Sequence, residues 1–574
     1  MINRWNLFTP TSTEKLKRND LSKETDLHPI LTLLLLRRGL TTKELIEQFF
    51  NPNLKDIHDP FLLPDMRKAI NRINEALGKK EQIMIYGDYD VDGTTAVALV
   101  YKFLHTYTTN LFYYIPDRYD EGYGISFLSI DVAEKKNVKL IIALDCGIKA
   151  IDKVKYAKEK GIDFIICDHH TPDTTLPDAV AVVDAKRIDS IYPYKHLSGC
   201  GVGFKLMQAF AKSNGISKKE LEDLFELTAI SIAADIVPVT GENRILAYYG
   251  LKQINRSCSP GIKGVIDVCG LNGKEINNSD IIFKIGPRIN ASGRMENGKE
   301  AVELLLSNNY KQALILSENI NRYNNERRQL DKKVTQEANE IINSIPNIED
   351  SKAIVVYNEN WHKGVIGIVA SRLAERYYRP AVVLTKSKDM VSGSARSIMG
   401  FDIYSAIENC RDLLESFGGH MYASGLSLKE NKLAAFRKKF IQIANKEIDA
   451  EQMIPQIDID DELSLVDINT TFMNQLKKLE PFGPHNPKPV FMTRNVKDYG
   501  TSKLVGRDQH HIKLEIIDST SNTPIHGIAF SMSKFYPYIK SGGKFNICYS
   551  LEENTYNGTT TLQLMVKDIK LEEM

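Results

Sequence analysis

The chain has 574 residues, enough for about four domains by length alone. Its hydrophobic share of 43% and charged share of 26% are ordinary for a soluble globular protein and exclude a fibrous or low-complexity chain. Because 74 Lys and Arg balance 73 Asp and Glu, the net charge of +1 excludes a uniformly basic surface, and any nucleic-acid groove has to be local.

Two features of the sequence predict the compartment. The seven cysteines are scattered and form no C-x-x-C pair, which is typical of a reducing cytosol. The first residues lack the apolar stretch of a secretory signal, and the apolar run from Ile30 to Leu36 is too short to cross a bilayer. We interpret that run as a buried helix and expect a cytoplasmic protein without a membrane partner.

The pattern of apolar residues changes along the chain and predicts an α/β protein with a β-rich C-terminal domain. The residues before about 70 are expected to be helical and are followed by an α/β domain. The predicted segments are a helical N-terminal segment (1–70), a parallel-sheet domain (71–310), a long connecting helix (311–345), a smaller α/β domain (346–450) and a β-rich domain (451–574).

The first α/β domain is predicted from short apolar runs that alternate with helical stretches. This alternation favours a parallel sheet with helices on both faces, and ligands of such sheets bind outside the carboxyl ends of the strands. The expected strands are Ile83–Tyr86, Phe112–Ile115, Leu140–Leu144, Phe164–Cys167 and Ala181–Val183.

The first of these strands leads into an acidic run. Asp88, Asp90 and Asp92 are spaced two residues apart, so in extended backbone their side chains point the same way. Converging like charges are unfavourable unless a cation neutralises them, and oxygen-rich clusters suit Mg²⁺ or Mn²⁺. An acidic turn left in water is the alternative for this motif alone.

Further acidic residues follow the later strands. Asp145 directly follows one strand, and Asp168-His169-His170 directly follows the next. A lone histidine at a strand end is more often a hydrogen-bonded structural residue than a ligand, but a pair beside an aspartate at the same sheet edge favours a metal site. The candidate ligands, enough for two ions that clamp a phosphoryl group, are Asp90, Asp92, Asp145, His169 and Asp235.

Apolar residues three or four apart predict a long helix over about 310–345, with Pro346 ending it. Its polar face is either a wall facing a nucleic-acid backbone or a solvated face, and we favour the solvated face. That face carries Arg322, Arg327, Arg328, Lys332 and Lys333.

The smaller α/β domain contains glycine-rich stretches with anion-binding character. Ser394 and Arg396 lie in G-S-A-R-S, and Gly419 and His420 lie in G-G-H. Glycine lets backbone N–H groups approach an anion, and arginine offers a planar fork to phosphate oxygens. A tight turn is the plain alternative for G-G-H.

The C-terminal domain alternates apolar and polar residues as strands do, for example over 511–517 and 562–566. Six Lys or Arg fall between Lys488 and Lys513, against Asp498 and Asp508. A basic strand face fits a groove for a single nucleic-acid strand, and a sheet edge protected by lysines is the alternative.

Together the motifs resemble a known superfamily. D-Y-D-x-D-G, D-C-G and D-H-H, beginning at Asp88, Asp145 and Asp168, are similar to the motifs of DHH phosphoesterases. Further stretches resemble the RecJ family, bacterial single-strand-specific 5′→3′ DNA exonucleases, and the resemblance extends from about residue 70 to the end. They are I-P-D-R (115–118), E-G-Y-G (121–124), L-S-G-C-G-V-G (197–203) and G-P-R-I-N-A-S-G-R (286–294).

The resemblance implies a function. It implies hydrolysis of single-stranded DNA with two Mn²⁺ or Mg²⁺ ions, release of 5′-mononucleotides, and a place in DNA repair and recombination. It also implies that residues 346–450 form a DHH-associated (DHHA1) domain that closes over the metal site, and that residues 451–574 form an OB-type domain. A single-strand-binding protein and a helicase are candidate partners.

Residue roles follow as hypotheses. Asp145 would bridge two metals, and Asp88 would be a further ligand or would orient one. Asp168 would orient a histidine, while His170 would donate to a phosphate oxygen or assist the leaving group. The expected substrate-binding residues, with Tyr123 as a base-stacking surface, are Arg118, Tyr123, Arg288, Asn290, Ser394, Arg396, Gly419 and His420.

Two departures from the family pattern affect loops only. Asp184-Ala185 stands where Asn-Pro is more usual, and His485 stands where Gly is common. Two other functions share these motifs: a phosphodiesterase for short oligonucleotides or cyclic dinucleotides, and a non-catalytic replication scaffold. The long C-terminal domain disfavours the first, and the complete ligand set disfavours the second.

Overall fold

In the computed structural model, which describes residues 3–556 and 559–572, the chain packs into two units. One unit runs from Leu54 to Met453, and the other joins the segment ending at Asn53 to the segment beginning at Ile454. The predicted α/β class with a β-rich C-terminal domain is confirmed. Among the described residues, no helix has both the length and the apolarity that a membrane span requires.

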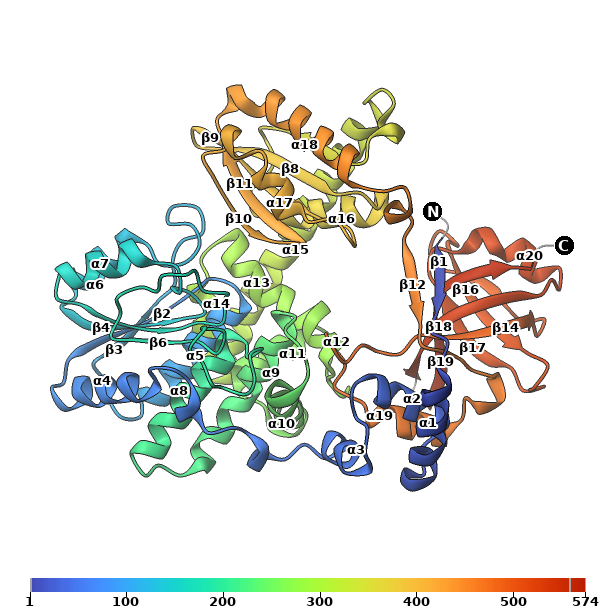
Figure 1. Ribbon diagram of the computed structural model, residues 1–574, viewed down its shortest axis with the longest axis horizontal. Coiled ribbons are helices and arrows are strands. Elements are labelled where there is room, and N and C mark those ends of the chain that lie inside the picture. The colour runs from blue at the N-terminus through green and yellow to red at the C-terminus, as the bar shows by residue number, and fades with distance from the viewer. Residues whose placement is uncertain (1–2, 557–558, 573–574) are drawn as a thin grey trace. The chain divides into compact units, whose positions relative to one another are not determined.

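The larger unit contains a five-stranded parallel sheet. Its strands, in spatial order, are β3 (Leu111–Tyr114), β2 (Gln82–Gly87), β4 (Val138–Leu144), β5 (Asp163–Cys167) and β6 (Ala181–Val183). The covering helices are α4 (Met66–Gly78), α5 (Val91–Leu104), α6 (Phe127–Lys135), α7 (Ile151–Glu159) and α8 (Gly199–Ser213). Helices α6 and α7 lie on one face and α4, α5 and α8 on the other (Figure 1). Because both faces are covered, the strands are unbroken apolar runs.

The register of the sheet brings its carboxyl ends into line. Gly87 of β2 pairs with Leu144 of β4, Leu144 pairs with Cys167 of β5, and Cys167 pairs with Val183 of β6. The residue after each of these four is an aspartate. The sheet edge therefore carries a row of carboxylates.

A helical layer follows the sheet and ends in one long helix. Its members are α9 (Phe225–Ala234), α10 (Gly241–Ser257), α11 (Pro260–Val268), α12 (Asn278–Asp280), α13 (Gly286–Met295), α14 (Lys299–Leu305) and α15 (Tyr310–Asn343), with a π-helical turn at Ile281–Ile285.

Helix α15 packs along its length. Its first half buries Ala313 and Ile320 in the core of the parallel-sheet domain, and its second half buries Val334, Ala338 and Ile342 in a separate core. The helix was predicted correctly. The expectation of a solvated polar face is wrong for Arg327, whose side chain is 13% exposed and lies 3.6 Å from the buried carboxylate of Asp331.

The second half of α15 packs against a mixed five-stranded sheet in the order β10-β11-β9-β8-β7. Only β7 and β8 are parallel to each other. The strands are β7 (Ile354–Tyr357), β8 (Ala381–Ser387), β9 (Met390–Arg396), β10 (Ser416–His420) and β11 (Ala423–Leu428). The helices are α16 (Ile366–Tyr377), α17 (Ile403–Glu408) and α18 (Leu433–Glu447).

The smaller unit contains a closed β-barrel. Strand β14 pairs with both β18 and β16, which closes the path β14-β18-β19-β17-β16, as in OB folds. The strands are β12 (Gln456–Ile459), β13 (Asp461–Glu462), β14 (Phe491–Asp498), β15 (Lys503–Val505), β16 (His511–Ile517), β17 (Ile525–Ala529), β18 (Phe545–Tyr556) and β19 (Thr559–Leu571). Two helices, α19 (Thr470–Lys477) and α20 (Tyr536–Lys540), complete it.

The N-terminal residues belong to this barrel unit. Strand β1 (Arg4–Leu7) pairs in parallel with β12, a pairing that the sequence analysis missed. Three helices follow: α1 (Ser12–Thr25), α2 (Pro29–Arg37) and α3 (Lys43–Phe50). The predicted buried helix is α2, whose Leu31, Leu34 and Leu35 share a core with barrel residues.

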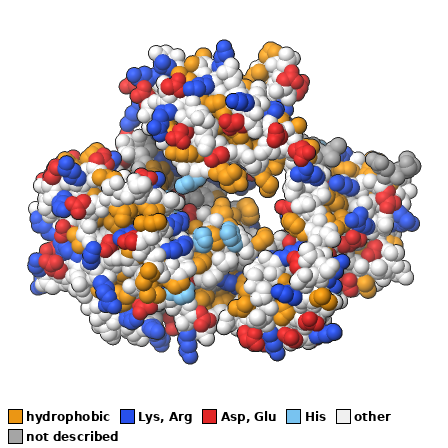
Figure 2. All heavy atoms as spheres, viewed as in Figure 1, with side chains coloured by type: hydrophobic (Ala, Val, Ile, Leu, Met, Phe, Trp, Pro, Cys, Tyr) orange, Lys and Arg blue, Asp and Glu red, His pale blue; other side chains and the backbone are white. Residues whose placement is uncertain are grey.

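On the face seen in Figure 2, acidic and basic groups are interspersed, in keeping with the net charge of +1. On this face, charges of both signs therefore largely offset one another at long range.

Candidate metal centre

The candidate centre lies at the carboxyl edge of the parallel sheet. Asp88, Asp145 and Asp168 directly follow β2, β4 and β5, whose ends are aligned by the register. Asp92 lies in the first turn of α5, and Asp235 ends α9. Asp88 and Asp168, eighty positions apart, thus meet because parallel strands end at one edge, and Asp235 joins them from the end of a helix.

The imidazole of His169 is the centre of the arrangement. Its Nε2 lies 3.2 Å from Oδ1 of Asp145, 3.6 Å from Oδ2 of Asp235 and 3.7 Å from Oδ2 of Asp92. Its Nδ1 lies 3.1 Å from the carbonyl of Leu197, to which it donates. Burial lowers the pKa of His169 to about 4, so the ring is neutral at physiological pH and Nε2 presents a lone pair.

The ionised form of this cluster needs a positive charge. When the three carboxylates are ionised, they and the neutral Nε2 are all acceptors, so a cation is needed to hold them together. Without a cation, burial favours a proton on Asp145 or Asp235. A metal-ligating histidine characteristically donates its other N–H to a carbonyl, as His169 does. Two overlapping groups have ligand atoms close enough to hold an ion: Asp145, His169 and His170, and Asp92, His169 and Asp235.

The aspartates differ in how well the protein satisfies them. Asp92 accepts hydrogen bonds from the N–H groups of Gly199 (2.6 Å) and Cys200 (2.8 Å) at the start of α8, and from the hydroxyl of Ser231 (2.6 Å). Among the described residues, by contrast, neither carboxylate oxygen of Asp88 nor Oδ1 of Asp145 has a hydrogen-bond donor. Such orphaned buried oxygens fit ligands for a hard cation.

The pKa values point the same way. Burial raises the pKa of Asp88, Asp145 and Asp235 well above the usual range of a carboxyl group, and neighbouring carboxylates add to this effect. The pKa of Asp90 is raised by burial and then by Asp92. A cation among these groups would favour their charged forms, so the donor set fits divalent metal ions.

Asp168 has the opposite environment. It accepts from the backbone N–H of Ile148, from those of both histidines and from Nδ1 of His170 (2.7 Å). Although burial opposes ionisation, the hydrogen bond and charge of His170 hold the pKa of Asp168 well below its usual range. In return Asp168 raises the pKa of His170 against the effect of burial. The Nε2 of His170 lies 3.2 Å from the hydroxyl of Tyr123.

Four of the predicted substrate residues have defined contacts or exposure in the structure. Arg118 stacks on the ring of Tyr89 at 4.9 Å and opposes the rise in the pKa of Asp88. Arg396 donates from Nη1 to the Oγ of Ser394 (3.1 Å), and both residues lie on β9. Tyr123 keeps 59% of its surface exposed, as a stacking platform would require.

Arg288 and Asn290 are engaged by the protein itself. Arg288 donates to the side chain of Asn321 (2.9 Å) and to the carbonyl of Lys284 (2.8 Å). Asn290 accepts from the backbone N–H of Val91 (3.1 Å), the residue between Asp90 and Asp92. This contact positions the acidic run, in addition to any contact with substrate.

Gly419 and His420 end β10. Gly419 has φ of 150°, and a Cβ there would collide with the carbonyl of Ala423, so only glycine fits. The residue His420 is exposed as a whole, but its ring is partly desolvated. This desolvation, and then the charge of His170, lowers the pKa of His420. His420 therefore lies within the electrostatic range of the metal centre.

Two residues of the site received no role from the sequence. Arg294 lies in the quoted G-P-R-I-N-A-S-G-R stretch; burial and then the charges of Arg118, Arg327 and Arg396 lower its pKa to about 10. Asp184 follows β6 as the fourth aspartate of the row and is fully buried. Its place directly after a predicted strand was the signal that could have revealed it.

Comparison with known proteins extends over most of the chain. Three family models match: the DHH family N-terminal domain (residues 82–232), the DHHA1 domain (350–446) and the RecJ OB domain (459–568). The single-stranded-DNA-specific exonuclease RecJ of Bacillus subtilis is 36% identical over 573 residues, covering 99% of this chain and 71% of that protein. That of Haemophilus influenzae is 34% identical, covering 95% and 96%.

Solved structures agree. RecJ from Thermus thermophilus in complex with Mn²⁺ has a TM-score of 0.84 at 24% identity, covers 100% of this chain and 80% of that chain, and shares its fold. An exonuclease RecJ bound to manganese is 30% identical, with a TM-score of 0.59 and coverage of 67% and 96%. Since relatives above 30% identity extend over nearly the whole chain, it belongs to the RecJ family of single-stranded-DNA-specific exonucleases in the DHH superfamily.

Proposed function

We propose that this protein removes 5′-mononucleotides from the 5′ end of single-stranded DNA, using two Mn²⁺ or Mg²⁺ ions bound at the sheet edge. The names of its relatives support the substrate, and manganese-bound relatives support the metal. The observation that carries the proposal is the neutral Nε2 of His169, which lies within 3.7 Å of carboxylate oxygens from three different aspartates.

The ligand assignment follows the two groups of donors. Asp92, His169 and Asp235 would hold one ion, and the other group consists of Asp145, His169 and His170. We assign to Asp145 the bridging role, because its Oδ1 is 3.2 Å from the Nε2 of His169, the residue that both groups share. Asp90 completes the proposed set, and Asp88 supplies the unsatisfied oxygens next to it. His170 also has a nitrogen within reach of the second group, so its ring either binds the metal or handles a proton beside it.

The chemistry combines the metals with a proton carrier. Bound cations of this class lower the pKa of a coordinated water and stabilise charge on a phosphoryl group. His170 keeps its Nδ1–H on Asp168, which favours the protonated ring and leaves Nε2 directed at Tyr123. We assign to His170 the donation of a proton or hydrogen bond to an oxygen of the scissile phosphate.

The end of the strand would be held by arginine and hydroxyl groups. Arg396 and Ser394 are already hydrogen-bonded to each other, and Arg118 is fixed by its stacking on Tyr89. Arginine forks match phosphate oxygens, so this group would hold a terminal phosphate or the backbone next to it. The exposed ring of Tyr123 would stack on a base.

The proposal includes a cellular setting. We expect action in the cytoplasm during DNA repair and recombination, with a single-strand-binding protein and a helicase as partners. The seven cysteines, none in a disulfide, suit a reducing compartment. The RecJ OB domain favours a long strand over a cyclic dinucleotide, and the intact donor set favours catalysis over a scaffold role.

The decisive variant is Asp145→Asn. It removes a charge from the proposed bridging position, so we expect hydrolysis to fall by roughly 10³-fold or more while strand binding persists. The assay is digestion of single-stranded and duplex DNA, labelled at either end, with Mn²⁺, Mg²⁺ or chelator. The parent should require metal and release nucleotides from the 5′ end of the single strand.

The matched control is Asp178→Asn, because the Asp178 side chain is 79% exposed and pairs only with Lys158 at the surface. It should retain parental rates. Undiminished turnover by Asp145→Asn would defeat the ligand assignment, and digestion in chelator would defeat metal dependence.

A further inference from the structure

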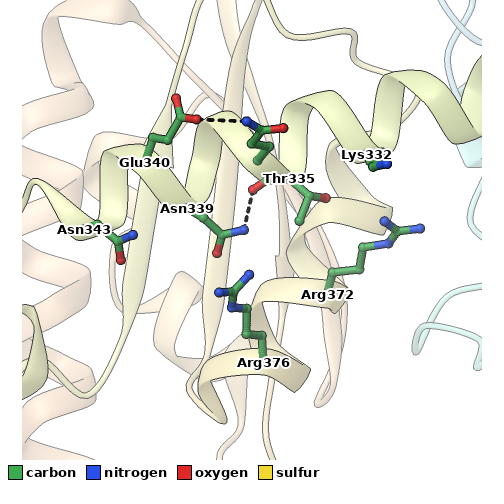
Figure 3. Close-up of a pocket in the computed structure, with 8 residues that line it drawn as sticks. Lys332, Thr335, Asn339, Glu340, Asn343, Arg372 and Arg376 are labelled. Atoms are coloured by element: carbon green, nitrogen blue, oxygen red, sulfur yellow. Dashed lines mark hydrogen bonds between the residues drawn. The ribbon is translucent and has the colours of Figure 1, made fainter. Parts of the chain in front are cut away.

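A polar groove lies between α15 and α16, away from the row of aspartates. It encloses about 300 Å³, and Figure 3 shows Arg372 and Arg376 of α16 reaching toward the side chains of α15. Lys332, Thr335 and Asn339 line the opposite side. Three positive charges and a set of neutral hydrogen-bonding groups thus face one open space.

The floor of the groove is built by hydrogen bonds. Asn339 donates to the carbonyl of Thr335 (2.7 Å) and accepts from the hydroxyl of Tyr377 (2.8 Å). The guanidinium of Arg372 lies 2.8 Å from a carboxylate oxygen of the fully buried Asp331. Because these contacts fix the side chains before a ligand arrives, binding costs less side-chain conformational entropy.

The charges of the groove are unequal at its two ends. Glu340 is the acidic lining residue, and it accepts a hydrogen bond from Gln336 (3.2 Å) at the end toward Asn343 (Figure 3). Lys332 and Arg372 lie at the other end. An anion is therefore favoured at the Lys332 end and disfavoured beside Glu340.

A series of arginines connects this end with the metal centre. Burial and then the charges of Arg118, Arg327 and Arg396 lower the pKa of Arg294. Burial also lowers the pKa of Arg327; the charge of Asp331 opposes this, and those of Arg328, Arg372 and Arg288 add to it. Arg372 lines the groove. Buried Asp331 lies 3.6 Å from the guanidinium of Arg327 and 2.8 Å from that of Arg372, so this one carboxylate holds Arg327 next to the groove.

We propose that the α15–α16 groove binds backbone phosphates of the DNA strand beyond the metal centre, without reading its bases. The inference rests on the proposed function, because it extends the path of the same substrate. Guanidinium and ammonium groups match phosphate oxygens, whereas none of the described residues that line the groove has an aromatic ring on which a base could stack.

The geometry makes the contribution of the groove to DNA affinity depend on the length of the strand. Along α15, Arg327 and Asn343 are sixteen residues apart, which is about 24 Å at a rise of ~1.5 Å per residue. A stacked strand advances about 3.4 Å per nucleotide. A strand of about 4 nucleotides, roughly 14 Å long, is shorter than this stretch of α15 and cannot contact both Arg327 and the far end of the groove, whereas one of about 20 nucleotides can.

The test is the double variant Lys332→Gln/Arg376→Gln. Both residues are exposed, so folding should be unaffected, and Arg372 is left in place because it balances buried Asp331. With chelator present to prevent digestion, affinity for the long strand should fall roughly tenfold at ~0.1 M salt, and the slope of log K against log salt should decrease by about 1.4. Affinity for the short strand should not change.

The matched control is Lys429→Gln/Lys438→Gln, which removes two exposed charges that do not line the groove. An unchanged salt slope in the groove variant would overturn the inference, as would equal losses for short and long strands or in variant and control. If the groove variant still hydrolyses the short strand with Mn²⁺, its metal centre is intact. If the parent protein itself fails to hydrolyse the short strand, that result counts against the proposed function and not against the groove.

Discussion

The four aspartates that end neighbouring strands share a position and differ in environment. Asp168 accepts several hydrogen bonds and its pKa is well below the usual range. At Asp88, burial and the charge of Asp90 outweigh the weak backbone contacts of Tyr89 and Gly124, and its pKa is well above the usual range. The donors that reach each carboxylate, and not its place after a strand, therefore determine its charge.

Asp184 provides a test at the scale of one residue. Burial raises the pKa of Asp184 from 3.8 to about 7. Between these pH values the folded protein therefore keeps a proton on Asp184 that the unfolded chain has already released. The parent therefore loses stability as pH rises from about 4 to about 7, and the loss is complete above pH 7. In urea unfolding, Asp184→Asn should be more stable than the parent, with an advantage that grows by roughly 2 kcal/mol between pH 5 and pH 8.

The exposed Asp178→Asn provides the baseline, since its stability relative to the parent should be the same at both pH values. An advantage of Asp184→Asn that stays constant from pH 5 to pH 8 would show that Asp184 does not titrate in this range. The substitution also moves the chain toward the Asn-Pro pattern from which it departs.

At the scale of an element, the first turn of α8 supports the metal centre. Its backbone N–H groups at Gly199 and Cys200 bind the carboxylate of Asp92, where the helix dipole favours negative charge. A Cβ at Gly199 would lie 2.5 Å from Oδ1 of Asp145. The helix start therefore has to be glycine for the two aspartates to approach each other.

Gly199→Ala tests this contact. The added methyl group should displace Asp145 and lower the rate of hydrolysis by roughly 10²-fold, because a shift of about 1 Å in a catalytic group has that effect. Metal titration should show weaker binding. Gly78→Ala is the control, since a Cβ there meets nothing within 4 Å and activity should remain parental. Full activity in Gly199→Ala would mean that Asp145 tolerates displacement.

At the scale of the whole molecule, each packing unit contains one of the two tryptophans. Trp5 donates from its indole N–H to Asp568 in the barrel unit, and Trp361 is buried beside α15 in the larger unit. Each unit can therefore be followed by the fluorescence of its own tryptophan, after the other has been replaced by phenylalanine.

Leu35→Ala tests whether the N-terminal helices stabilise the barrel. Leu35 is fully buried in the core that α2 shares with the barrel strands, so its truncation should lower the unfolding free energy reported by Trp5 by about 2–5 kcal/mol. The Trp361 transition should not move. Leu373→Ala, in the core around Trp361, should do the reverse. Equal shifts of both reporters in either variant would mean that the two units unfold together.

Sequence patterns identified much of this architecture because they are local. The apolar runs of β2, β4, β5 and β6 and the periodicity of α15 are properties of consecutive residues, and the structure confirms them. The domain boundaries stay predictions. Strand β1 was missed because its four residues form a strand only by pairing with β12, about 450 positions away in the sequence.

The sequence by itself determined the family, the fold class and the identity of the residues that meet at the sheet edge, because strand ends can be read from the chain. Only the tertiary structure decided which carboxylates find donors, that His169 presents a neutral lone pair to three of them, and that Arg327 pairs with a buried aspartate. These properties depend on partners far away in sequence, whose distances and burial exist only after the helices pack.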